Sequence, residues 1–234
     1  RTRAILLYVE SIESPRKFMS AARAAARNKP VIVIKSGRSA QGQKAAASHT
    51  GALAGSDAVY DAAIARAGML RVNSLQELFL AAETLARFRT NRSESLTILT
   101  NGGGAGVMAA DAAAQVNVPL TELGAPTLAQ LDAVLPANWS HGNPVDIIGD
   151  APVKRYGEAL QILHNDPNGA AVLFIHAPTA IVPSAEIATA LSALPQSATA
   201  WLMGCWLGGH GVEAARQLFK GAGIADYPTP EEAV

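Results

Sequence analysis

The sequence predicts an α/β fold made of two doubly wound, mostly parallel sheets. Short apolar runs alternate along the chain with longer segments of helical periodicity, which is the pattern of strand-helix-strand units. The 234 residues exceed the commonest domain size of roughly 100 to 150 residues. The polar stretch 90–95 interrupts the alternation. We therefore expect two domains, residues 1–90 and 96–234.

The first half contains three short apolar runs that we predict as strands, 5–9, 31–34 and 70–72. Helical patterns occupy 15–27, a stretch near 51–54, 57–67 and 75–87. The last helix begins with Ser74 and Glu77, a pair that satisfies free amides of a first turn. Residues 36–48 are small, polar and interrupted by glycines, so we predict a loop there. Connections of about 2 to 6 residues suffice between a strand and a helix, which suggests a function for this longer one.

The second half repeats the alternation without a residue-level repeat of the first. Predicted strands are 96–100, 118–120, 171–175 and 198–203, and predicted helices are 107–115, 128–135, 153–164, 184–194 and 212–221. Thr127 and Gln130 form the expected cap of the helix at 128–135. Near the end, Thr229 followed by Pro230 is typical of a helix N-terminus. We interpret the chain as a piece of a longer polypeptide.

Composition excludes several classes of function. The 19 basic and 19 acidic residues cancel, which disfavours nucleic acid or an anionic membrane as partner. No apolar run approaches the ~20 residues that span a bilayer. The single cysteine, Cys205, excludes an intrachain disulfide and fits a reducing cytoplasm. Hydrophobic residues make up 49% and charged residues 16%, so we expect faces covered by further domains or subunits in an oligomer.

The region around His49 is the first candidate for chemistry. Lys35, Arg38 and Lys44 are cations within or beside the predicted loop. Ser48, Thr50 and Gly51 surround the imidazole with small side chains and free amides, at what we predict to be a helix start. Amides and the positive end of a helix dipole favour a phosphoryl group there. We therefore interpret His49 as a nucleophile. The alternative is a histidine that caps a helix.

A nucleophilic histidine needs an acceptor on its other ring nitrogen to fix its tautomer. Glu10 directly follows the predicted strand 5–9, and the carboxyl ends of parallel strands share one edge of a sheet. We therefore expect Glu10 to orient His49. The alternative is a solvated loop acid.

The turn at Gly102, Gly103 and Gly104 is the second candidate anion site. It follows a predicted strand and opens a helix. It is not a Walker A sequence, and it fits the dinucleotide pattern in two of three glycines. A tight strand-helix corner is the alternative. Because both this turn and the His49 loop leave strand ends, we expect them to face one shared ligand.

Other notable residues favour structural interpretations. Asp146 is expected to stabilise its own turn. We expect Cys205 to be a buried small residue. The four other histidines have no neighbours at metal-ligand spacing, so we predict neither a role for them nor a metal site: His141, His164, His176 and His210.

Four motifs in order resemble the NDP-forming acyl-CoA synthetases, relatives of succinyl-CoA synthetase. They are Lys-Ser-Gly-Arg-Ser at 35–39, Ser-His-Thr-Gly-Ala-Leu-Ala-Gly at 48–55, Asn-Gly-Gly-Gly-Ala-Gly at 101–106 and Asn-Pro-Val-Asp-Ile at 143–147. The resemblance covers nearly the whole chain. It implies two flavodoxin-like ligase domains, and an acid-thiol ligase that interconverts acyl-CoA, ADP and phosphate with acid, CoA and ATP.

The same resemblance assigns roles and partners. It implies that His49 is phosphorylated, that Glu10 is its partner, and that helices starting at 50–51 and 103–104 hold the phosphate. It also implies a CoA-binding domain and an ATP-grasp domain elsewhere. CoA, ADP or ATP, and Mg would then be used by the full-length protein, with none bound tightly here. We expect this segment alone to be inactive.

Two other interpretations stay open from the sequence. Residues 18–25 and 66–73 resemble the synthetase region fused to a GNAT domain in protein lysine acetyltransferases, which predicts a non-catalytic acyl-CoA sensor. A flavodoxin-like binder unrelated to ligases predicts a flavin or NAD at residues 102–106.

Overall fold

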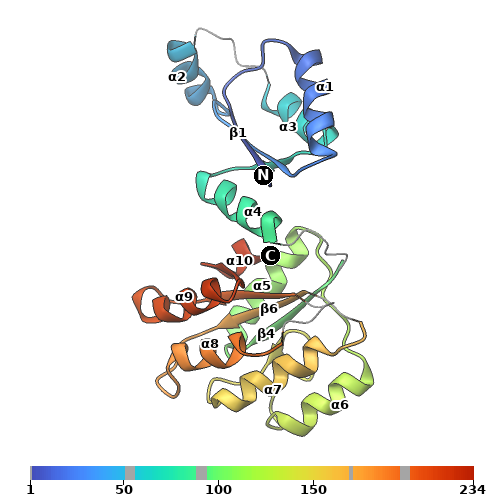
Figure 1. Cartoon of the computed structure of the whole chain (residues 1–234), viewed down its shortest axis with the longest axis vertical. Helices are drawn as coiled ribbons and strands as arrows, with labels where there is room; N and C mark the ends of the chain where they lie inside the picture. Colours follow the sequence, from blue (N-terminus) through green and yellow to red (C-terminus); the bar gives the residue numbers. More distant parts are fainter. Residues whose placement is uncertain (1, 51–55, 88–93, 169–170, 196–200) are drawn as a thin grey trace. The chain divides into compact units, whose positions relative to one another are not determined.

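The computed structural model describes residues 2–50, 56–87, 94–168, 171–195 and 201–234, with the side chains of residues 49 and 50 excepted. The chain divides into two compact units, Arg1–Thr90 and Asn91–Val234, each with a sheet of its own (Figure 1). All strand pairs in both sheets are parallel, so the predicted fold class is confirmed.

Unit 1 has a three-stranded sheet in the order β1-β2-β3. Its elements are β1 (Ile5–Val9), α1 (Pro15–Ala26), β2 (Val31–Lys35), α2 (Ala40–Thr50), α3 (Asp57–Arg66), β3 (Leu70–Val72) and α4 (Leu75–Arg87). The central strand β2 is buried along its whole length. Its alternate side chains pack against two layers, with α1 and α3 on one face and α4 on the other. This two-sided burial explains its continuous apolar run.

The capping residues predicted for α4 are confirmed. The Ser74 hydroxyl accepts a hydrogen bond from the Glu77 amide at 3.1 Å, and the Glu77 carboxylate accepts one from the Asn73 amide at 2.8 Å. Two free amides at the start of α4 are thereby satisfied.

The prediction of a loop over 36–48 is wrong, because α2 occupies Ala40–Thr50. Ser39 begins this helix: its hydroxyl accepts from the Gly42 amide at 3.1 Å, and its carbonyl accepts from the Gln43 amide at 2.8 Å. A serine cap and a run of alanines outweigh the glycine in the first turn.

Unit 2 has a five-stranded sheet in the order β5-β4-β6-β7-β8. Its elements are β4 (Leu96–Thr100), α5 (Gly103–Gln115), α6 (Ala125–Val134), β5 (Val145–Asp146), α7 (Val153–His164), β6 (Ala171–His176), α8 (Ser184–Ser192), β7 (Leu202–Trp206), the 3₁₀ turn η1 (His210–Val212), α9 (Glu213–Gly221), β8 (Ala225–Tyr227) and α10 (Pro230–Ala233). α7 and α8 cover one face of the sheet, and α5 and α10 pack together on the other (Figure 1).

Two helix starts in unit 2 differ from the prediction. α5 begins at Gly103 instead of residue 107, so the glycine turn itself forms its first turn. α6 begins at Ala125, with Pro126 in its first turn, and Thr127 is a buried residue inside the helix instead of its cap. At the end of the chain the predicted cap is confirmed, because the Thr229 hydroxyl accepts from the Glu232 amide at 3.2 Å.

The strands of unit 2 differ from the prediction at several places. Residues 118–120 form a single parallel bridge, between Leu120 and Leu96, instead of a strand. The strand predicted over 198–203 corresponds to β7, which runs over Leu202–Trp206, because Gly204 and the buried residues after it continue the sheet. Residues 198–200 of that prediction lie outside the described part of the chain. β5 and β8 were not predicted: they are two and three residues long, too short for a periodic signal.

Gly204 in β7 has no room for a side chain. A Cβ there would lie 2.6 Å from Cδ2 of Phe219, a buried residue of α9. We expect Gly204→Ala to lower the free energy of unfolding of unit 2 by about 1 to 3 kcal/mol, the usual cost of overpacking. Gly157→Ala is the matched control, because a Cβ there meets nothing within 4 Å in the middle of α7. It should gain about 0.5 to 1 kcal/mol. Urea unfolding measures the free energy of unfolding of both variants. Equal changes in the two would contradict the close packing of Gly204 against Phe219.

His176 makes the stability of unit 2 depend on pH. It is fully buried at the end of β6, with Nε2 3.0 Å from the Ser184 hydroxyl oxygen. Burial lowers the pKa of His176 to about 4, from 6.5. Between these values the unfolded chain binds a proton that the folded chain does not. Stability is therefore complete above pH 6.5 and is lost as pH falls towards 4, by about 3 kcal/mol. In His176→Gln the loss of stability with falling pH should be smaller. Unfolding curves of the wild type and the variant between pH 4 and 7 measure this difference.

Candidate functional site

The carboxyl edge of the unit 1 sheet collects several charged residues. The register pairs Val9 of β1 with Lys35 of β2, so Glu10 directly follows at the same edge. Lys35 is buried, with its ammonium 4.6 Å from the centroid of the Tyr60 ring. Burial lowers the pKa of Lys35, while the negative charges of Asp57 and Glu10 act in the opposite direction. A buried cation and a half-buried carboxylate thus lie at this edge.

His49 lies in the last turn of α2. Because Thr50 lies within α2, no helix starts at this residue, and the part of the prediction that concerns Gly51 lies outside the described residues. His49 lies more than two turns after Ala40, the first residue of α2, and the field of a helix dipole falls off within the first turn, so the start of α2 does not supply the positive field expected at His49. The predicted helix near 51–54 and Gly51 itself lie outside the described residues. Contacts of the His49 ring, including the one expected with Glu10, stay a prediction.

Ser48 is exposed on α2 and donates from its hydroxyl to the Ala45 carbonyl at 2.6 Å. This bond to the preceding turn is common for serine inside helices. The phosphate-binding role assigned to Ser48 and Thr50 stays a prediction.

A cluster of ion pairs, which we call the Asp57 cluster, lies beside this edge and consists of Arg38, Asp57, Arg71 and Asn73. Asp57 accepts from Arg38 Nε at 3.2 Å through one carboxylate oxygen and from Arg71 Nη2 at 2.5 Å through the other. Arg38 Nη1 also donates to the Asn73 side-chain oxygen at 2.5 Å. The hydrogen bond from Arg71 holds the pKa of Asp57 below its ordinary value. The sequence did not predict this cluster, because residues 38, 57 and 71 are far apart in the chain and no sequence motif connects them.

The glycine turn of unit 2 presents free amides. Gly102 is the N-cap of α5, and its own amide donates to the Thr100 hydroxyl at 3.0 Å. The amides of Gly103 and Gly104, both exposed, have no acceptor among the described residues. They lie at the positive end of a 13-residue helix. This geometry suits an anion.

The residues at the ends of β5 and β6 lie at the same edge of the sheet as the glycine turn. The Asn101 side chain bonds both backbone groups of Ala177, at 2.8 and 2.9 Å, which joins the ends of β4 and β6. A Cβ on Gly103 would lie 2.8 Å from Oδ2 of Asp146, so only glycine fits against this carboxylate.

The loop after Asp146 is held in a strained conformation. Oδ1 of Asp146 accepts from the Ile148 amide at 2.9 Å, which confirms the turn-stabilising role expected of Asp146. Ile148 itself has a φ of +68°, a left-handed conformation that is rare for a β-branched residue. The Asp146 hydrogen bond helps to keep this strained loop against the edge of the sheet.

The remaining candidates have structural contacts. His141 lies between the Asp132 carboxylate at 2.9 Å and the Ala137 carbonyl at 3.0 Å. Cys205 is fully buried, as expected, and burial raises the pKa of its thiol to about 12. Over the described ranges of the chain, no three His, Cys, Asp or Glu residues are grouped so that they could hold a metal ion.

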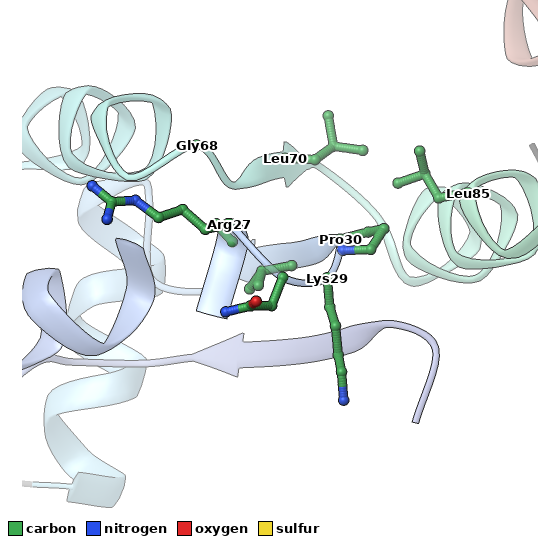
Figure 2. A pocket seen from close by; sticks show the side chains of 9 residues that line it. Arg27, Lys29, Pro30, Gly68, Leu70 and Leu85 are labelled. Carbon is green, nitrogen blue, oxygen red and sulfur yellow. The ribbon is translucent and has the colours of Figure 1, made fainter. Parts of the chain in front are cut away.

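An open pocket of about 430 Å³ lies elsewhere in unit 1. Pro30 and Leu70, which line it, precede or begin β2 and β3, so it lies at the amino ends of the strands. Figure 2 shows Arg27 and Lys29 beside it, with Leu85 of α4 across from them. Glu10 and α2 follow the opposite ends of the strands, so this pocket is separate from the predicted site.

Comparison with known proteins identifies the family. The succinyl-CoA ligase like flavodoxin domain matches residues 1–85, and the Ligase-CoA domain matches residues 96–232. The chain therefore belongs to the CoA ligase family that these two domains define, and the resemblance found in the four motifs is confirmed.

Its relatives are ADP-forming enzymes. The chain is 42% identical to the ADP-forming acetate–CoA ligase I of Archaeoglobus fulgidus, over 100% of this chain and 33% of that protein. It is 38% identical to the alpha subunit of the corresponding Pyrococcus furiosus ligase, over 100% of this chain and 51% of that subunit. The chain thus spans between a third and about half of the relatives' length.

A solved structure agrees in fold. The dinucleotide forming acetyl-coenzyme A synthetase 1 of Ca. Korarchaeum cryptofilum, in complex with phosphate and ADP, superposes with a TM-score of 0.89. Identity is 32%, over 99% of this chain and 51% of that one. Within the described residues of this chain, no helix is long and apolar enough to cross a membrane.

Proposed function

We propose that this chain is the ligase-domain portion of an NDP-forming acyl-CoA synthetase that works through a phosphohistidine. The observation that carries the proposal is the alignment of both units, along the whole chain, with ADP-forming acetate–CoA ligases. The exposed Gly103 and Gly104 amides at the start of α5 add a place for an anion.

The proposed reaction transfers one phosphoryl group twice. Phosphate first attacks the thioester carbonyl of acyl-CoA, which releases CoA and forms an acyl phosphate. A neutral ring nitrogen of His49 then attacks phosphorus; an N–P bond forms, the P–O bond to the acyl group breaks, and the carboxylate leaves. A terminal oxygen of ADP finally attacks the same phosphorus, which breaks the N–P bond and gives ATP. Splitting the transfer in this way is covalent catalysis.

The described residues assist this chemistry electrostatically. Glu10 is proposed to accept a hydrogen bond from the N–H of the other His49 ring nitrogen, which favours the nucleophilic tautomer. The free amides of the α5 N-terminus are proposed to stabilise the charge on the phosphoryl oxygens. Lys35, buried beside Glu10, adds a fixed positive charge at the same sheet edge.

Other parts of the reaction need partners. CoA and ADP or ATP are proposed to bind domains or subunits beyond this chain, which covers 33% to 51% of its relatives. Mg is proposed to be used by the full-length protein together with the nucleotide. A cytoplasmic oligomer with these partners is proposed, and the chain alone should not turn over.

The direct test follows the reaction in the protein that contains this chain together with its CoA- and nucleotide-binding partners. Acetyl-CoA, phosphate and ADP are supplied, and ATP is measured by a coupled assay. Formation of ATP that requires all three substrates supports the proposal. CoA release without ATP would contradict a ligase function.

The sensor interpretation is not favoured. The relatives described above are named as ligases or synthetases, and none of the observations in unit 1 or unit 2 points to an acetyltransferase. The unrelated flavin or NAD binder is not favoured either, since both domain matches are to CoA ligases.

A further inference from the structure

The segment that carries His49 is tied at both of its ends. Arg38 precedes α2, Asp57 begins α3, and residues 39–56 lie between them in the chain. Arg38 and Asp57 are nevertheless in contact, with 3.2 Å between Nε and Oδ2. The ion pair therefore joins the entry and the exit of the segment across 19 positions of sequence.

Both ends are also attached to the rigid sheet. Arg71 lies in β3, and its side chain is only 11% exposed. It donates to the Asp57 carboxylate at 2.5 Å and to the Asp57 carbonyl at 3.3 Å, so the side chain and the backbone of one residue are held together. Arg38 is held separately, by Asn73.

Asn73 connects the cluster to α4. Its amide donates to the Glu77 carboxylate, which belongs to the capping pair of that helix. The Asp57 cluster thus links the two ends of the His49 segment, strand β3 and the start of α4. Each contact uses a charged group, and Arg38 and Arg71 each hold two partners with their planar guanidinium groups.

We propose that Arg38, Asp57 and Arg71 are positioning residues. They hold the two ends of the segment 39–56, the His49 segment, in a fixed position relative to the sheet edge that bears Glu10. The inference rests on the proposed function, in which His49 must meet an acyl phosphate and then ADP. A phosphoryl carrier needs fixed ends, because a misplacement of about 1 Å can cost on the order of 100-fold in rate.

A purely stabilising role predicts a different outcome. Asp57 and Arg38 are 30% and 45% exposed, and exposed ion pairs contribute little to stability. Arg71 is only 11% exposed, but it keeps the Asp61 carboxylate and the Asp57 carbonyl as acceptors when the Asp57 carboxylate is removed. Loss of the cluster should therefore slow phosphoryl transfer without a matching loss of stability.

Asp57→Asn and Arg38→Gln remove the two sides of the pair. Asp61→Asn is the matched control: Asp61 lies on the same helix and contacts the same Arg71, at 3.3 Å, but is 68% exposed and outside the His49 segment. The full-length protein with its partners is first phosphorylated with labelled ATP. Excess ADP is then added, and the rate at which label leaves the protein is measured together with the melting temperature.

We expect Asp57→Asn to lower this rate about 10- to 100-fold at an unchanged melting temperature. Asp61→Asn should match the wild type. The double variant Arg38→Gln/Asp57→Asn should be no slower than Asp57→Asn, because both changes break one unit. A wild-type rate in Asp57→Asn, or a loss that follows the melting temperature across the variants, would overturn the proposal.

Hydrogen exchange of the α2 amides 40–48 gives a readout that does not need activity. Exchange should be faster in Asp57→Asn and Arg38→Gln than in the wild type and Asp61→Asn. Equal exchange in all four proteins would overturn the proposal. If the wild type takes up no label, the proposed function fails, and the exchange experiment still tests whether the cluster holds the segment.

Discussion

Replacing His49 by asparagine should abolish ATP formation by the full-length protein. In the proposed reaction every phosphoryl group passes through an N–P bond to this residue, and an amide nitrogen is not a nucleophile. Removing a covalent nucleophile costs on the order of 10⁴-fold or more. Phosphate-dependent release of CoA in a single turnover should persist, because it precedes the transfer to His49. A coupled ATP assay and a free-thiol assay measure the two steps.

His141→Asn is the control for this substitution. His141 is partly exposed in unit 2, and its φ of +51° is one that asparagine tolerates. We expect this variant to form ATP at nearly the wild-type rate. If His49→Asn also retains ATP formation, the phosphohistidine route is wrong, whatever ligase activity the protein has.

Introducing a carboxylate at Gly104 should block the proposed anion site of unit 2. Gly104 is exposed in the first turn of α5, and a side chain there meets nothing within 4 Å. In Gly104→Asp the new carboxylate can take up the free amides and repels phosphate. Loss of an oxyanion donor costs about 10² to 10³ in rate, so we expect ATP formation to fall about 100-fold. A negative charge at a helix N-terminus is favourable, so the melting temperature should hold or rise.

Gly104→Ala separates charge from size at this position. It adds a methyl group in open space and improves helix propensity by up to about 1 kcal/mol, so it should be active and at least as stable as the wild type. Gly103→Ala should be less stable than Gly104→Ala, because its Cβ would collide with Asp146 Oδ2 at 2.8 Å. Full activity in Gly104→Asp would show that the α5 N-terminus does not bind the reacting phosphate.

The sheets were largely predictable because their strands are unambiguous. β2 and β4 are short, apolar and buried on both faces, and their bounds agree with the prediction to within one residue. Helix α2 was not predictable in the same way. Gly37 and Gly42 indicated a loop, but a Cβ on Gly42 would come within 3.3 Å of Gly37, so this glycine allows a tight turn to pack on the helix.

The site was predictable where one residue's neighbours in the sequence are also its neighbours in space. The glycine turn and Asp146 were found in this way, since each acts through local backbone groups. The Asp57 cluster was not, because Arg38 and Arg71 meet Asp57 only after β2 and β3 pair. The helix start expected at His49 was misplaced, since His49 and Thr50 lie within α2, whose first residue is Ala40.

Mapping the phosphoryl group on the wild-type protein tests the central claim most directly. The full-length protein is incubated with labelled ATP and digested with trypsin at high pH. Cleavage after Lys44 and Arg66 gives a peptide, 45–66, in which His49 is the only histidine. We predict acid-labile, base-stable label in this peptide, released by ADP as ATP. Label confined to other peptides, or an acid-stable ester in 45–66, would contradict the account.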